Sequence, residues 1–294
     1  MMKGLIFFLA VVSATAAFAR GSLMDAVYTV PHEMDALVKS GHVQGASCSE
    51  RGIYISHMLG IDLIGWDGRH IAHADAPKHL GDCAYADGKV YGAICLLDAK
   101  PTDRTQGLIR VWDEDLKTVL ADIPSDVKLD GAVVLDGFFY TSPDMLGRKP
   151  HPGCPIRKYR LPDLRLVEAR VIDIGYDIFF GAQTLGTDGT DLFLGNYGAP
   201  AEANNPNRYD FTRVTTNLEH RANMNFFASE GFGLVPKSVS KRDTPVFFAV
   251  RSLNGGIRAW RADPEKNPPR LRIDFFEYAD GKLENITRRN PTKE

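Results

Sequence analysis

Five polar residues stand at equivalent positions in five similar segments, and their side chains could do chemistry. They are Gln44, Asp82, Asp130, Gln183 and Glu230. Three carboxylates that share a small volume repel one another, so at least one pKa rises unless a cation or a proton intervenes. Such a group could bind Ca²⁺ through oxygen ligands or pair a general acid with an ionised partner. Alternatively, the same side chains could hydrate a channel and bond to backbone amides.

Other residues are expected to lie near this set in the fold. Three long loops, predicted over 96–106, 142–155 and 196–207, should lie at the same end of the molecule and carry recognition. We expect the catalytic or metal-binding residues to be Asp82, Asp130 and Glu230. The ligand-binding residues are expected to be Gln44, His79, Gln183, Tyr197, Arg251 and His151. His79 and Arg251 are the cations expected nearest to the acids.

A repeat places these residues. Trp66, Trp112 and Tyr159 each end a short alternating segment, at intervals of 46 and 47 residues, and Trp260 continues the series. Asp-Gly pairs at 87–88, 136–137 and 188–189 precede strand-like segments, which is a hairpin signal. Such units predict four-stranded sheets with first strands near 43–50, 80–86, 129–135, 181–187 and 230–236. The spacing favours an all-β, five-bladed β-propeller with four antiparallel strands per blade. A pair of irregular β-sandwiches is the alternative, but it would not explain the near-constant aromatic spacing.

The repeat also sets the boundaries of the chain's parts. The propeller is predicted over 42–280, and a C-terminal tail follows at 281–294. The segment 20–41 could close the ring through an outer strand at 26–30, or could hold a short helix around 32–40. In the alternative closure, the C-terminal strand at 271–278 completes the last blade alone.

Residues 1–19 have the composition of a signal peptide. One lysine precedes a short apolar run, and Ala17-Phe18-Ala19 fits a small-x-small cleavage site. The run is too short for a membrane span, which needs roughly 20 apolar residues, so an anchor is the less favoured alternative. We expect a secreted or periplasmic protein, with cleavage after Ala19 and no membrane span.

Composition narrows the class of protein. The 294 residues are 44% hydrophobic and 24% charged, which excludes collagen-like, coiled-coil and disordered chains. The formal net charge of −2 lacks the basic excess of a nucleic-acid binder. We expect a monomer that takes a small-molecule or glycan ligand.

The four cysteines allow either disulfides or buried thiols. An exported chain with an even number of cysteines can form two bridges. If one forms, Cys95 and Cys154 are the expected pair, because they should lie at the same face of adjacent blades. Cys48 and Cys83 would then remain buried thiols in first strands.

Three strings carry a family resemblance: QGASCSERGIYIS, HLGDCAYADGKVYGAI and GLIRVWDEDLKTV. They resemble secreted bacterial β-propellers of the broad gluconolactonase-like, NHL-like and quinoprotein-like assemblage. The resemblance implies the fold, which hosts many activities. Gluconolactonase-type enzymes hold a divalent metal with a Glu, Asn and Asp set. Glu230, Asp82 and Asp130 could play such parts, although their order and flanking residues differ.

Two functions from different classes follow. The first is a hydrolase or lyase that acts on a sugar or glycan in a carboxylate-containing pocket at the channel mouth. The second is a non-catalytic scaffold that binds carbohydrate or protein. Nucleotide-binding loops, a nucleophile elbow and a zinc-protease motif do not occur in the sequence.

Overall fold

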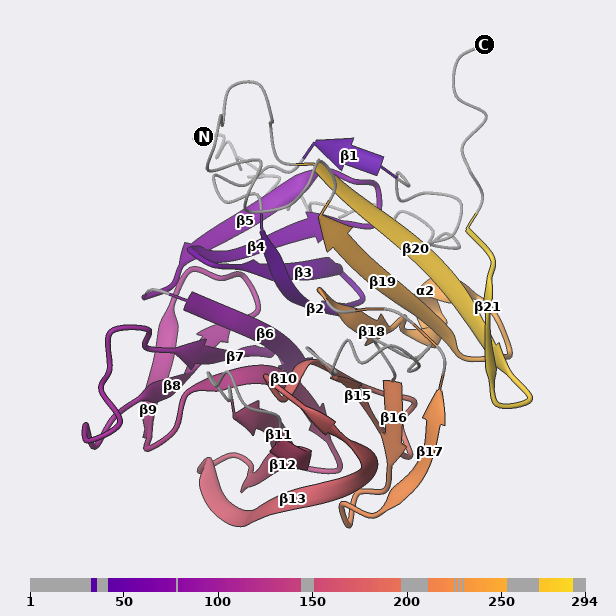
Figure 1. The fold of residues 1–294 in the computed structure, drawn as a ribbon. Coiled ribbons are helices and arrows are strands. Elements are labelled where there is room, and N and C mark those ends of the chain that lie inside the picture. Colours follow the sequence, from indigo (N-terminus) through magenta and orange to yellow (C-terminus); the bar gives the residue numbers. More distant parts are fainter. Residues whose placement is uncertain are drawn as a thin grey trace, which may run out of the picture.

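The computed structural model describes residues 33–35, 42–77, 79–143, 151–196, 211–224, 226, 228, 230–252 and 270–287. Its strands form five antiparallel sheets arranged around a central axis (Figure 1), which confirms the predicted five-bladed β-propeller. The predictions at 26–30, and those for Tyr197 and Trp260, lie outside the described residues. Within the described part of the chain, no helix combines the length and apolarity that a membrane crossing requires.

Each of the first four blades is a meander of four strands that runs from the axis outward. Blade one contains β2 (Val43–Ser49), β3 (Gly52–His57), β4 (Gly60–Gly65) and β5 (His70–Asp75). Blade two contains β6 (His79–Ala86), β7 (Lys89–Cys95), β8 (Gly107–Asp113) and β9 (Val119–Ser125). Blade three contains β10 (Leu129–Leu135), β11 (Phe138–Pro143), β12 (His151–Arg160) and β13 (Arg165–Ile178). Blade four contains β14 (Ala182–Thr187), β15 (Leu192–Asn196), β16 (Phe211–Val214) and β17 (His220–Met224).

Blade five joins the two ends of the described chain. Its three main strands are β18 (Phe232–Leu234), β19 (Val246–Ser252) and β20 (Arg270–Ala279), and α2 (Lys237–Ser240) lies between the first two in sequence. Two short strands, β1 (Glu33–Asp35) and β21 (Lys282–Asn285), both pair with β20, at opposite ends of its length. An N-terminal strand therefore helps to close the ring. Strand β1 stands where a short helix was one of the alternatives, and β21 begins the segment predicted as a tail.

The first strands of the five blades, called the inner strands below, form a closed ring. Strand β2 contacts β6, and the series continues through β10, β14 and β18 back to β2. Ring closure of this kind leaves only short outer edges unpaired. Two of the three Asp-Gly signals act as expected, because Asp87 and Gly88 have φ of 49° and 72°, and Asp136 and Gly137 have φ of 51° and 75°. At the third signal, only Gly189 has a positive φ, of 87°. Two consecutive residues with positive φ make the turn whose twist matches paired strands.

One apolar layer fills each junction between neighbouring blades. Trp112, at the end of β8, packs against blade one, and Tyr159, near the end of β12, packs against blade two. Trp66, directly after β4, packs against blade five, and Val214 occupies the same place between blades three and four. The aromatic repeat is thus a packing repeat, since each anchor closes the junction with a neighbouring blade.

Candidate functional site

The inner strands come very close together where the five predicted polar residues lie. A Cβ added at Gly45 would fall 1.9 Å from Asp82 Oδ1, and one added at Gly81 would fall 2.4 Å from Asp130 Oδ1. Only glycine permits this approach. The five residues Gln44, Asp82, Asp130, Gln183 and Glu230 are called the polar ring below.

Asp82 is fully buried and its carboxylate connects three blades. The backbone N–H groups of Cys83, Ala132 and Leu185 donate to it at 2.8, 3.2 and 2.8 Å, and the Thr184 hydroxyl lies at 3.3 Å. Burial raises the pKa of Asp82 well above its usual value, and these hydrogen bonds oppose the rise. Through these hydrogen bonds, the carboxylate holds strands β6, β10 and β14 together.

A second contact also crosses the axis. The Gln183 side-chain amide donates to Gln44 Oε1 at 2.7 Å, and both residues are buried. Gln44 belongs to blade one and Gln183 to blade four, which are not neighbours in the ring. Together with the link from Asp82 to Leu185, this bond ties opposite sides of the channel at the level of the polar ring.

Glu230 and Arg251 take partners within blade five. Glu230 accepts a hydrogen bond from the Ser252 backbone N–H. Burial raises the pKa of Glu230, and the Ser252 donors and the charge of Arg251 oppose the rise. Arg251 forms its ion pair with Asp274, at 3.3 Å.

The remaining predicted residues that the structure describes are Asp130, His79 and His151. Asp130 is buried in β10. His79 begins β6, where burial, followed by the neighbouring charge of His42, lowers its pKa to about 4. His151 is exposed at the start of β12.

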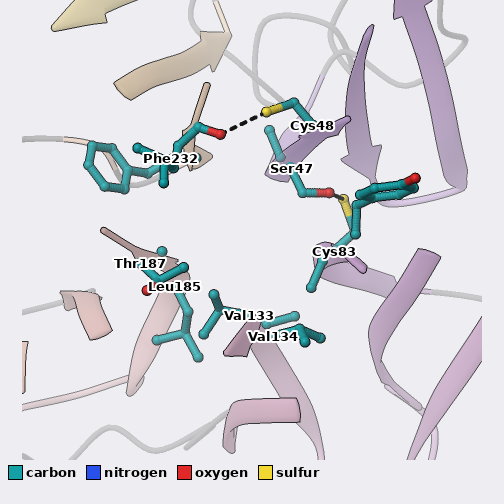
Figure 2. A pocket seen from close by; sticks show the side chains of 15 residues that line it. Ser47, Cys48, Cys83, Val133, Val134, Leu185, Thr187 and Phe232 are labelled. Atoms are coloured by element: carbon teal, nitrogen blue, oxygen red, sulfur yellow. Dashed lines mark hydrogen bonds between the residues drawn. The ribbon is translucent and has the colours of Figure 1, made fainter. Parts of the chain in front are cut away.

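A pocket lies further along the inner strands, beyond the polar ring (Figure 2). It has a volume of about 190 Å³ and is lined by all five inner strands. The lining residues are Ala46, Ser47, Cys48, Cys83, Ala84, Tyr85, Ala132, Val133, Val134, Leu185, Gly186, Thr187, Phe232, Gly233 and Leu234. We call this the axial pocket. Most of these side chains are apolar and none carries a carboxylate, so it differs from the carboxylate-containing pocket expected from the sequence.

The polar groups of the axial pocket are few and mostly engaged. The Thr187 hydroxyl donates to the Asp191 carbonyl at 2.8 Å, and the Tyr85 hydroxyl donates to Glu114 at 3.2 Å. The Cys48 thiol donates to the Leu234 carbonyl at 3.0 Å. The surface facing the cavity is therefore mixed, with more apolar than polar atoms.

The predicted disulfide between Cys95 and Cys154 is wrong, because none of the four cysteines takes part in a disulfide. Cys95 ends β7 in blade two, where its backbone pairs with His79 and Gly107. Cys154 instead packs into the apolar layer between blades three and four. Cys95 thus ends the second strand of its blade, whereas Cys154 lies near the start of the third strand of the next blade.

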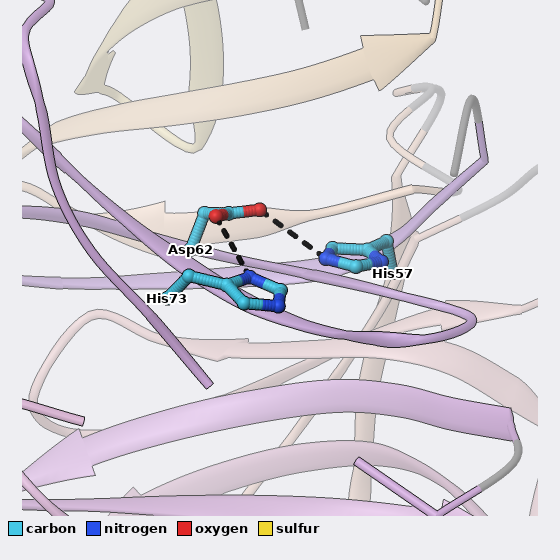
Figure 3. Close-up of side chains that lie close together, drawn as sticks. All are labelled: His57, Asp62 and His73. Atoms are coloured by element: carbon cyan, nitrogen blue, oxygen red, sulfur yellow. Dashed lines mark hydrogen bonds and ion pairs between the residues drawn. The ribbon is translucent and has the colours of Figure 1, made fainter. Parts of the chain in front are cut away.

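A cluster on blade one was not predicted from the sequence. It is made of His57, Asp62, His70 and His73 and is called the histidine cluster below. Asp62 is buried, and its Oδ1 lies 2.8 Å from His70 Nε2 and 3.0 Å from His73 Nδ1. Its Oδ2 lies 3.2 Å from His57 Nε2. Figure 3 shows the carboxylate with one oxygen directed toward His57 and the other toward His73.

Local strand geometry explains why this cluster forms. Asp62 pairs directly with His73 across β4 and β5. Residues three apart in a regular strand point to opposite faces, which would separate His70 from His73. A register shift pairs Leu63 with Ala72 and then Ile64 with His70, so this bulge returns His70 to the face of Asp62.

Asp62 is ionised more readily than an ordinary aspartate. Burial raises its pKa, but hydrogen bonds from His57 and His70 and the charges of the neighbouring imidazoles outweigh burial, so the pKa is lowered. The cluster therefore presents a deprotonated carboxylate with three imidazoles around it.

Comparisons with known proteins support the fold but do not indicate a chemical activity. No family model and no curated protein matches the sequence. The solved structure of Myxococcus xanthus glutaminyl cyclase is similar, with a TM-score of 0.54 and 10% identity over 87% of this chain and 96% of that one. Kuenenia stuttgartiensis hydrazine synthase gives a TM-score of 0.47 at 11% identity, over 86% and 68% of the two chains. A luciferin-regenerating enzyme gives 0.46 at 10% identity, over 83% and 79%. The likeness to glutaminyl cyclase supports the fold alone, and the two lower scores carry no argument.

Proposed function

We propose that this protein is a binding propeller that receives a small, largely apolar molecule in the axial pocket. The observation that carries the proposal is a cavity lined by the inner strands of all five blades. Concave sites with apolar walls and a few polar groups are the usual form of small-molecule sites. A ring-closed scaffold holds such walls rigidly, because each inner strand is fixed by two neighbours.

The size of the pocket bounds the ligand. An apolar cavity of about 150 Å³ in another protein accommodates benzene. At about 190 Å³, the axial pocket suits a molecule with one ring and one or two polar substituents. The free thiols and the Ser47 hydroxyl, whose oxygen lies 3.6 Å from Cys83 Sγ, are the groups that could orient it.

A sugar, the ligand class expected from the sequence, is the second candidate. It would need hydrogen-bond partners for several hydroxyl groups, and unpaired polar groups are costly in a buried site. Because Thr187 and Tyr85 are already engaged, the lining offers few partners. The axial pocket therefore favours the apolar class, although the fold equally suits a carbohydrate binder.

Catalysis by the polar ring finds little support in its contacts. Asp82 already accepts bonds from three backbone N–H groups, which compete with a reacting proton or a cation for the same oxygens. These donors do not fit a Ca²⁺ site built on Asp82. Binding without turnover is the simpler role. We also propose that residues 1–19 direct export, because they have the composition of a signal peptide.

Ligand-observed NMR with p-cresol and D-glucose as probes tests the proposal. The variant Val134→Trp places an indole in the pocket, because Val134 lines it. The matched control is Val119→Trp, at an exposed position on the outer strand β9. We expect p-cresol to bind the wild type and Val119→Trp but not Val134→Trp.

The other outcomes separate the candidates. Binding of D-glucose that is lost in Val134→Trp would establish the carbohydrate function instead. If neither probe discriminates between the two tryptophan variants, the axial pocket is not the binding site and the proposal fails.

A further inference from the structure

We propose that Asp62, His70 and His73 form a binding site for a divalent transition-metal ion on the outer half of blade one. The site is separate from the axial pocket, and the proposal does not depend on that pocket. It rests on a convergence of one carboxylate and two imidazoles from adjacent strands.

One oxygen of the Asp62 carboxylate already lies close to a nitrogen of each imidazole. Asp62 Oδ1 is 2.8 Å from His70 Nε2 and 3.0 Å from His73 Nδ1. Ligands of a tetrahedral ion at about 2.0–2.2 Å are separated by roughly 3.3–3.6 Å. The two contacts with Asp62 are slightly shorter than this spacing, so the imidazoles must move outward to admit an ion.

Burial divides the roles of the three residues. The Asp62 side chain is 2% exposed, whereas those of His70 and His73 are 35% and 39% exposed. The carboxylate is thus a fixed anchor, while the two imidazoles stand on the edge strand β5 and can rotate toward an ion. Their exposure also leaves room for water or a substrate as a further ligand.

His57 is assigned as a positioning residue rather than a ligand. Ligand atoms of His57, Asp62 and His73 lie within 4.8 Å of one another, so His57 must be considered. However, the Leu59 backbone N–H donates to His57 Nδ1 at 3.2 Å. The neutral ring then carries its hydrogen on Nε2, which faces Asp62 Oδ2 at 3.2 Å. His57 can hold the second carboxylate oxygen and leave Oδ1 for the ion.

His73 has the support that metal-binding histidines usually have. Its Nε2 lies 3.2 Å from Asp75 Oδ1, while Nδ1 faces Asp62. A histidine that binds a metal through one nitrogen commonly donates its other N–H to a carboxylate, which fixes the tautomer. Asp75 and His57 thus orient the ligands from two sides.

The donor types select the class of ion. Imidazole nitrogens suit zinc, copper, iron and nickel, whereas calcium prefers oxygen ligands only. Two imidazoles and one carboxylate leave an open position on a zinc ion, as in catalytic sites. The predicted ion is therefore of the Zn²⁺ class and not the Ca²⁺ expected at the polar ring.

The experiment uses the full chain after treatment with a chelator. Zn²⁺ binding is measured by isothermal titration calorimetry, and Co²⁺ is added as a spectroscopic probe of coordination. The variants are His70→Gln and His73→Gln, which lie on the exposed edge, together with Asp62→Asn and His57→Gln. His151→Gln and His220→Gln are matched controls at exposed histidines elsewhere.

We expect one Zn²⁺ per chain, and loss of that binding in His70→Gln, His73→Gln and Asp62→Asn. His57→Gln should weaken affinity by roughly 10- to 100-fold without changing the Co²⁺ spectrum, as for a residue that orients a ligand. Both controls and Val134→Trp should bind as the wild type does.

Several results would overturn the proposal. If the wild type binds no Zn²⁺ above the level of His70→Gln and His73→Gln, the site does not exist. If His57→Gln abolishes binding and alters the Co²⁺ spectrum while His70→Gln does neither, the assigned ligand set is wrong. Because His70 and His73 lie on an exposed edge, these tests stand even if Asp62→Asn does not fold.

Discussion

Two buried aspartates lie in this propeller in opposite chemical surroundings. Asp82 is surrounded by neutral donors, mainly backbone N–H groups from three blades. Asp62 is surrounded by imidazoles from its own blade. The pKa of Asp82 is raised by burial, whereas that of Asp62 is lowered because its partners outweigh burial. Burial alone therefore does not determine what a carboxylate does.

The two aspartates differ in whether their hydrogen-bond partners can release a proton. A backbone N–H cannot give up its hydrogen, so Asp82 is fixed in one role and holds inner strands together. An imidazole can lose a proton and bind a metal ion with the freed lone pair. The histidine cluster is therefore the more versatile of the two sites, although only the polar ring was expected from the sequence.

Removal of the Asp82 carboxylate should have the largest effect. Asp82→Ala leaves three backbone N–H groups in the interior without their acceptor, and each such group costs about 1–3 kcal/mol. We expect a loss of about 3–5 kcal/mol in the free energy of unfolding, measured by urea denaturation. Asp82→Asn keeps one acceptor oxygen and should lose less. An Asp82→Ala variant as stable as the wild type would show that Asp82 does not fasten the ring.

Asp62→Asn should have a smaller effect in the absence of metal. The change removes the charge but leaves an oxygen that can accept from one imidazole, and two of the three histidines are partly solvated. We expect a loss of about 1–2 kcal/mol by the same urea measurement in chelator. Added Zn²⁺ should stabilise the wild type and not the variant. Equal stabilisation of both proteins would separate Asp62 from the metal site.

The pH dependence should distinguish the two aspartates by sign. Asp62 has a lowered pKa in the folded state, so its contribution is present above the ordinary value of about 3.9 and is lost as pH falls toward the folded value. Asp82 has a raised pKa, so its contribution is present below about 3.9 and is lost as pH rises toward the folded value.

Urea midpoints between about pH 3 and pH 8 measure this difference. The advantage of the wild type over Asp62→Asn should grow as pH rises from about 3 and then level off above about 4. Relative to Asp82→Asn, the wild type should lose stability as pH rises above about 4. If both comparisons change in the same direction, the two environments do not differ as described.

The fold could be predicted from the sequence because its signals are local and repeated. Asp136-Gly137 fixes a turn, and Trp112 fills a junction, in ways that depend on few distant residues. The same repeat predicted that Asp82 lies near the axis. The partners of Asp82 could not be predicted, because the hydrogen bond from Leu185 depends on the relative positions of blades two and four along the axis.

The histidine cluster could not be predicted from the sequence, for a different reason. His70 and His73 are three residues apart, a spacing that in a regular strand sends them to opposite faces. Only the bulge opposite Leu63 and Ile64 brings them together, and no residue type in that segment indicates a bulge. His57 reaches the cluster from a third strand, so spacing in the sequence carries no signal for it.

The smallest expected effect concerns the thiol beside Asp82. Burial, followed by the charge of Asp82, raises the pKa of Cys83 to about 12. Because the thiolate is the reactive form, Cys83 should react with iodoacetamide at about pH 8 far more slowly in the folded protein than in urea, as followed by peptide mass spectrometry. Asp82→Asn removes the charge of Asp82 but not the burial of Cys83, which is the larger cause of the raised pKa. The variant should therefore speed the reaction slightly in the folded state and not at all in urea.

Cys154 provides the control for this thiol experiment. It is equally buried, and burial also raises its pKa to about 12, without a contribution from Asp82. If Asp82→Asn speeds the reactions of Cys83 and Cys154 equally, the variant has loosened the whole ring. A change confined to Cys83 would show that Asp82 acts on that thiol through its charge.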